Sequence, residues 1–98
     1  MPKKEYREDG ETCLVTFELP AEAGAQEAYL CGEFNSWDQT CQPMTAREDG
    51  SFSLTLELRA GRSYRYRYVL DGANWVNDWL ADGYQVNPYG SEDSVVEV

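Results

Sequence analysis

The stretch SYRYRYVLDGANW (residues 63–75) alternates aromatic and basic side chains and then breaks at Asp71-Gly72. Successive side chains of a β-strand point to opposite faces of a sheet, and no segment of the chain shows convincing helical periodicity. Tyr66 and the aromatic residues two positions away from it therefore share one face, and Arg67 points to the other. The stretch predicts a strand with an aromatic core face and a basic outer face, followed by a turn.

The same alternation recurs along the chain between turn signals, at the spacing of about 8–12 residues that is typical of an all-β sandwich. Asp49-Gly50 marks a tight turn and predicts a hairpin. The polar segment 79–93, which is interrupted by Gly and Pro, is predicted to be a loop. Besides residues 63–70, strands are expected in TCLVTFELP (12–20), AYLCGEF (28–34), QPMTAR (42–47), FSLTLEL (52–58), NWVND (74–78) and SVVEV (94–98).

About seven short antiparallel strands, without the cysteine pattern of antibody domains, predict an all-β, immunoglobulin-like β-sandwich. The 98 residues, 42% of them hydrophobic, suffice for one domain with a modest core. This sandwich is expected to occupy residues 11–98. The charged segment 1–10 is expected to be a mobile N-terminal extension.

The charge balance restricts the classes of partner. Eighteen acidic and eight basic residues give a net charge of -10, which disfavours partners that are bound through phosphate, so neither nucleic acid nor a membrane is expected. No apolar run is long enough for a membrane span or a signal segment, and we expect a cytoplasmic protein. Cys13, Cys31 and Cys41 cannot all pair with one another and are expected to be reduced structural thiols.

Catalysis is disfavoured by the residue types present. The chain has no histidine, which excludes Ser-His and Cys-His nucleophiles. Carboxylate pairs of the kind used by glycosidases remain formally open, but the acidic residues fall at turns, where backbone reasons favour them. Asp71, Asp78 and Asp82 lack the spacing of a calcium-binding loop and are predicted to be solvated turn carboxylates. No enzyme activity, metal or cofactor is predicted.

The tryptophans indicate a binding surface. Trp37, Trp75 and Trp79 lie in or next to predicted loops, where a rigid aromatic ring can stack on the apolar face of a sugar. One such residue alone could merely fill an end of the sandwich. Trp37 and Trp75 together, with Arg67 facing outward on the intervening strand, favour sugar binding. Single-stranded nucleic acid also uses stacking in a basic groove, but the net charge favours a neutral polyol.

The stretch YLCGEFNSWD (29–38) resembles the family 48 carbohydrate-binding modules, also called isoamylase N-terminal or early-set domains. The glycogen-binding domain of the AMP-activated protein kinase β subunit is a well-known relative. The resemblance runs from about residue 12 to residue 98. It is also carried by DGSFSLTLEL (49–58), YRYVLDGANWVND (66–78) and NPYGSEDSVVEV (87–98).

The resemblance implies an early-set β-sandwich that binds α-1,4-glucan through two stacking tryptophans and a basic residue, which match Trp37, Trp75 and Arg67. In the terminal loop, the kinase module has a leucine, a threonine and an asparagine where this chain has Tyr89, Ser91 and Asp93. A tyrosine can still stack and a serine can still form hydrogen bonds, whereas an aspartate lacks the amide donor. Asn35 is expected to be structural and to fix the turn before the first tryptophan.

The expected function is non-catalytic binding of α-1,4-glucan, such as glycogen, a starch-like glucan or a maltooligosaccharide, by a free-standing module. The alternative is a structural or protein-interaction module that docks onto a glucan-processing enzyme in trans, such as a glycoside hydrolase or branching enzyme. In the first case, replacing Tyr66 should lower stability, whereas replacing Arg67 should lower affinity.

Overall fold

A computed structural model describes residues 2–35, 42–72, 74–79, 81–88 and 90–98. These residues form nine strands and two short 3₁₀ turns, and no helix among them is long and apolar enough to span a membrane. The strands are β1 (Lys3–Tyr6), β2 (Thr12–Leu19), β3 (Ala28–Gly32), β4 (Thr45–Ala46), β5 (Phe52–Arg59), β6 (Ser63–Leu70), β7 (Asn74–Val76), β8 (Gly83–Val86) and β9 (Glu92–Glu97), and the turns are η1 (Ala21–Ala23) and η2 (Glu33–Asn35).

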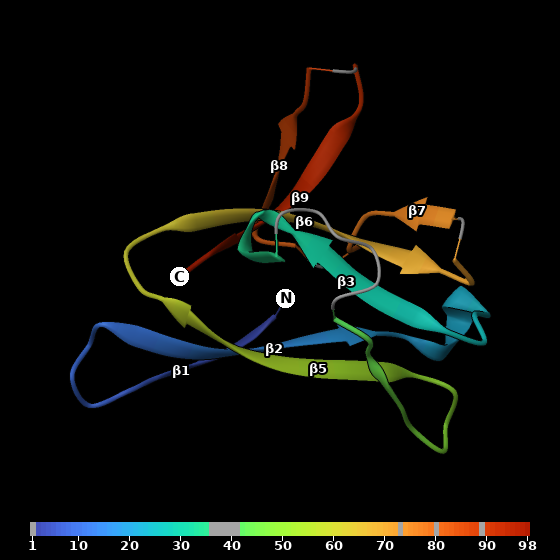
Figure 1. Cartoon of the computed structure of the whole chain (residues 1–98), viewed down its shortest axis with the longest axis horizontal. Helices are drawn as coiled ribbons and strands as arrows, with labels where there is room; N and C mark the ends of the chain where they lie inside the picture. The colour runs from blue at the N-terminus through green and yellow to red at the C-terminus, as the bar shows by residue number, and fades with distance from the viewer. Residues whose placement is uncertain (1, 36–41, 73, 80, 89) are drawn as a thin grey trace.

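The strands form two antiparallel sheets that face each other across the core (Figure 1). One sheet has the order β1-β2-β5-β4, and the other has the order β3-β6-β9-β8, with β7 also paired to β6. This arrangement confirms the immunoglobulin-like sandwich. The β8–β9 hairpin extends away from the rest of the molecule at the top of the view.

Two strands were not expected from the sequence. β8 lies within the segment 79–93, so the prediction of a loop there is wrong at this strand. Tyr84, Gln85 and Val86 are all exposed. β8 is an edge strand of its sheet and has no buried face, so its sequence need not alternate apolar and polar residues. β1 lies within the segment 1–10, where it pairs with β2; the mobility of that segment stays a prediction. An edge strand rich in charged residues, such as KKEY in β1, has the same composition as a solvated tail, so the sequence did not reveal it.

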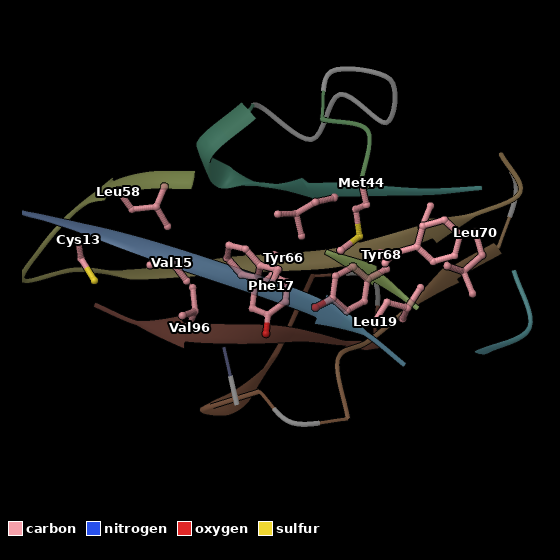
Figure 2. Close-up of a cluster of buried hydrophobic side chains, with 13 residues drawn as sticks. Cys13, Val15, Phe17, Leu19, Met44, Leu58, Tyr66, Tyr68, Leu70 and Val96 are labelled. Carbon is pink, nitrogen blue, oxygen red and sulfur yellow. The ribbon is translucent and has the colours of Figure 1, made fainter. Parts of the chain in front are cut away.

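The core is built from the alternate residues that the sequence indicated. Tyr66 and Tyr68 of β6 are fully buried, and the ring of Tyr66 meets Phe17 of β2 edge-on at 4.9 Å between centroids (Figure 2). Arg67 lies on the opposite face of β6, so the two-faced interpretation of the strand is confirmed. The buried cluster contains Cys13, Val15, Phe17, Leu19, Ala28, Leu30, Met44, Phe52, Leu58, Tyr66, Tyr68, Leu70 and Val96.

A carboxylate is buried beside the two core tyrosines. Asp78 is 6% exposed, and its Oδ2 accepts hydrogen bonds from the hydroxyls of Tyr66 at 2.6 Å and Tyr68 at 3.2 Å. Its backbone N–H donates to Oγ of Ser94 at 2.8 Å, and its carbonyl accepts from the Tyr84 hydroxyl. The prediction of a solvated turn carboxylate is therefore wrong for Asp78, because hydrogen bonds take the place of its solvation.

The same correction applies to Asp82. Its side chain is 6% exposed, and its Oδ2 accepts hydrogen bonds from Nζ of Lys4 and the backbone N–H of Glu97. This ion pair joins the start of β1 to the opposite sheet. Asp71 is exposed as expected and accepts hydrogen bonds from the backbone N–H groups of Gln26 and Glu27.

The end of β3 requires a residue without a side chain. A Cβ atom on Gly32 would lie 2.5 Å from the carbonyl oxygen of Arg65 and 2.8 Å from the ring of Phe34. The glycine allows η2 to fold back over β6, and Phe34 then packs beside Phe17 and Tyr64. Close backbone approach at this point therefore fixes the position of Glu33.

We predict that Gly32→Ala lowers the free energy of unfolding by about 1–3 kcal/mol, because the new methyl group meets backbone as well as an aromatic ring. Urea unfolding followed by circular dichroism measures the loss. Gly83→Ala is the matched control, since nothing lies within 4 Å of the position that its methyl group would take. Its effect should stay within about 1 kcal/mol, and equal losses in both variants would contradict the close-approach argument.

We also predict that stability falls with pH above about 10, where unfolded tyrosines ionise. Burial, reinforced by Asp78, raises the pKa of Tyr66 and Tyr68 far above the usual range, so the folded state keeps both phenols neutral. Their contribution is complete below the unfolded pKa and declines above it by about 1.4 kcal/mol per pH unit for each tyrosine. Urea unfolding between about pH 8 and 11 should show a smaller slope for Tyr68→Phe. An unchanged slope would contradict the prediction.

Candidate functional site

The outer face of the β6 sheet carries an open groove of about 580 Å³. It lies on the side of the sheet opposite the core, where β6 and β9 meet the turn between β8 and β9. Among the described residues, its lining is formed by Glu33, Arg65, Arg67, Trp75, Asn87, Pro88, Ser91 and Asp93.

The strand register explains why these side chains meet. Trp75 pairs with Val69, and Arg67 lies two residues before Val69 on the same face of β6. Residues 63–66 of β6 pair with β9, whereas residues 68–70 pair with β7 on the same edge. Arg67 therefore occupies the position at which β9 leaves β6 and β7 replaces it. The groove lies at this junction.

Side chains satisfy the backbone at the junction. The carbonyl of Glu92 accepts hydrogen bonds from Nη2 of Arg67 and from Nδ2 of Asn77, the latter at 2.8 Å. Oδ1 of Asn77 in turn accepts from the backbone N–H and the hydroxyl of Ser94, at 3.0 and 2.9 Å. Arg67 and Asn77 thus take the place of ladder hydrogen bonds where the strands separate.

Contacts at two of its three guanidinium nitrogens, Nη2 and Nε, hold the Arg67 side chain in place. Nη2 also donates to Oγ of Ser91 at 2.9 Å, and Nε lies 3.1 Å from Oδ1 of Asp93. The angle at Nε does not allow a hydrogen bond, so this contact is an ion pair held by charge. The side chains of Arg67 and Asp93 are only 18% and 8% exposed, which limits solvent screening of the pair. Among the described residues, Nη1 has no hydrogen-bond acceptor.

The wall of the groove is a closed turn between β8 and β9. The backbone N–H of Asn87 donates to the carbonyl of Ser91 at 2.8 Å, and the Ser91 N–H donates to Oδ1 of Asn87 at 3.2 Å. Nδ2 of Asn87 donates to Oγ of Ser91 and Oδ1 of Asp93. The turn is therefore connected through these side chains to Arg67 at the base of the groove.

The far end of the groove carries two charges of opposite sign. Oε1 of Glu33 accepts a hydrogen bond from the backbone N–H of Arg65 at 2.7 Å. The Arg65 guanidinium points across the sheet, where its Nε donates to Oε1 of Gln85 at 3.2 Å. Arg65 therefore has an uncharged partner, in contrast to Arg67.

Four of the six predicted site residues lie together in this groove, namely Arg67, Trp75, Ser91 and Asp93. The two others, Trp37 and Tyr89, lie outside the described residues, as does the side chain of Asn35. Ligand contact by all six stays a prediction.

Trp79 is 63% exposed and does not line the groove. Glu33, Arg65, Asn87 and Pro88 line it but were not predicted as site residues. Alternation in the sequence does place Arg65 on the same outer face as Arg67, whereas the other three depend on turn geometry. No three His, Cys, Asp or Glu side chains in the described part of the chain come together to hold a metal.

The chain belongs to carbohydrate-binding module family 48, the isoamylase N-terminal domain family, whose sequence profile matches residues 6–90. This match confirms the family that the motifs indicated. Members of the family are non-catalytic modules associated with carbohydrate binding. No curated protein matches the chain.

Solved structures with a similar fold include two esterase structures from Shigella flexneri. Enterochelin esterase superposes with a TM-score of 0.74 at 14% identity. The enterobactin esterase determined in the presence of 2,3-dihydroxy-N-benzoyl-glycine superposes with a TM-score of 0.69 at 17% identity. Both alignments cover 98% of this chain but only 32% of the esterase. At these identities, the likeness concerns the fold alone.

We predict that Arg67 and Asp93 are energetically coupled. Arg67→Lys and Asp93→Asn should each lower the free energy of unfolding by about 1–2 kcal/mol, because each leaves a poorly exposed partner incompletely compensated. The double variant should lose less than the sum, with a coupling energy of about 0.5–3 kcal/mol. Urea unfolding of the four proteins measures this cycle. Additivity within about 0.3 kcal/mol would show that the pair is not coupled.

Proposed function

We propose that the groove binds α-1,4-glucan without catalysis. The observation that carries this proposal is the placement of a 40% exposed tryptophan, Trp75, beside a fixed set of polar groups on one open face. A flat aromatic ring supplies contact area for the apolar face of a pyranose at low entropic cost. Fixed polar groups next to it can orient the sugar hydroxyls.

The polar groups of the groove suit a polyol. Oε2 of Glu33 and Oδ2 of Asp93 are acceptors, while Nη1 of Arg67 and the guanidinium of Arg65 offer donors. Each sugar hydroxyl both donates and accepts, so a mixed lining can satisfy it in either sense. From Arg65 to Val69, the partner of Trp75, the groove follows four residue steps of β6, roughly 13 Å, which suits about two or three sugar rings.

The affinity should be modest, because an open groove leaves much of a bound oligosaccharide in water. We expect dissociation constants on the order of 10 µM to 1 mM. Arg67 has a double role in this proposal: it holds the turn in place and presents Nη1 to the ligand. Replacing Arg67 should therefore lower stability as well as affinity, whereas the sequence alone led us to expect an effect on affinity only.

We predict that calorimetric titration with maltoheptaose and with β-cyclodextrin gives saturable binding. Trp75→Ala should raise the dissociation constant by about tenfold or more, because the stacking area is lost. Trp37→Ala should act in the same direction if its match to the family's first tryptophan is functional. Trp79→Ala is the matched control, since it removes an exposed tryptophan that does not line the groove, and it should leave the affinity unchanged.

Absence of heat and of NMR chemical-shift changes in the intact protein at millimolar sugar would overturn the proposal. It would favour the alternative, a module that docks onto a glucan-processing enzyme, such as a glycoside hydrolase or branching enzyme, without binding sugar. Two observations support this second candidate. Trp79 and Val86 are 63% and 68% exposed outside the groove, and the similar Shigella flexneri esterases contain this fold as 32% of a longer chain.

A further inference from the structure

We infer that the groove discriminates against anionic glycans and that Glu33 is the residue that sets this preference. The inference rests on the proposed glucan-binding function and adds the charge class of the ligand. It starts from a side chain that lies in the stretch YLCGEFNSWD (29–38) and to which the sequence alone assigned no role.

The position of Glu33 is fixed by its neighbours. Gly32 permits close approach to β6, and Phe34 is held among core aromatic rings. Between them, Glu33 places Oε1 on the backbone N–H of Arg65 at 2.7 Å. The carboxylate is thereby held at the groove, and its Oε2 has no hydrogen-bond partner among the described residues.

The described lining carries two positive and two negative side chains, but only one positive and one negative side chain are in direct contact. Arg67 and Asp93 form a direct ion pair, so their charges compensate each other locally. Glu33 and Arg65 form no ion pair, because the Arg65 guanidinium points to Gln85 and donates a hydrogen bond from Nε to its Oε1. Glu33 and Arg65 therefore remain as two separate charges, and removal of either one changes the net charge that a ligand meets.

An anionic glycan would meet an unfavourable balance. Its phosphate, sulfate or carboxylate groups would be attracted by the Arg65 guanidinium, but Glu33 repels them and offers them only acceptor atoms, so the two side chains offset each other for an anion. The net charge of -10 adds a long-range repulsion. A neutral glucan avoids both costs, because its hydroxyls can donate to Glu33. The charge class of the preferred ligand is therefore neutral.

The test compares neutral β-cyclodextrin with β-cyclodextrin sulfated on its primary rim, by calorimetry at low salt. The wild-type protein should bind the neutral probe more tightly. Glu33→Gln keeps an oxygen that can accept from the Arg65 N–H but removes the charge, so it should improve binding of the sulfated probe relative to the neutral one by about threefold to tenfold. Arg65→Gln should shift the same ratio in the opposite direction.

Glu57→Gln is the matched control, because it removes one negative charge from β5 on the other sheet. It should shift the ratio much less than Glu33→Gln does. The shift caused by Glu33→Gln should shrink at about 0.5 M salt, where salt screens charges that lie more than a few ångströms apart. A purely structural role of Glu33 would not give this salt dependence.

Each outcome is decisive. If the wild-type protein binds both probes equally, or if Glu33→Gln and Glu57→Gln shift the ratio equally, the inference is overturned while glucan binding stands. If the wild-type protein binds only the sulfated probe, the inference and its neutral ligand class both fail. If neither probe nor maltoheptaose binds, the proposed function itself fails.

Discussion

The exchange of neighbours along one edge of β6 is the constraint on which both the core and the groove depend. β9 pairs with the first half of the strand and β7 with the second half. Backbone groups at the point of exchange lack their ladder partners, and polar side chains must satisfy them. Arg67 and Asn77 do so by donating to the carbonyl of Glu92. The residue best placed to meet a ligand is thus also required by the fold.

Period-2 alternation predicted much of this arrangement. It identified the core face of β6 and placed Arg67 on the outer face, whereas Trp75 was assigned to a binding surface because it lies next to a predicted loop. It did not predict β8, because an edge strand with exposed side chains carries no hydrophobic period. It also did not predict the burial of Asp78, because the acceptor role of that carboxylate depends on tyrosines that are ten or more residues away. Alternation within a strand carries no information about such contacts.

Two residues of the groove at which this chain is compared with the kinase module, Arg67 and Asp93, contact each other in the structure. The resemblance matches Arg67 to the basic residue of that module and Asp93 to its asparagine, and in this chain the two side chains form an ion pair. Arginine presents a planar set of donors, which allows Arg67 to reach Ser91 and Glu92 as well as Asp93. Considered alone, the aspartate had lost a donor. Considered with Arg67, it compensates a charge that would otherwise be poorly solvated.

The shared edge of β6 also determines which changes of length the family fold can tolerate. Inserting or deleting one residue within β6 would turn every following side chain to the opposite face, so that tyrosines would leave the core as arginines entered it. Both layers would be damaged by a single event. We therefore expect changes of length to be tolerated in the turns between strands, where the shape of the groove can change while the strand beneath it keeps its register.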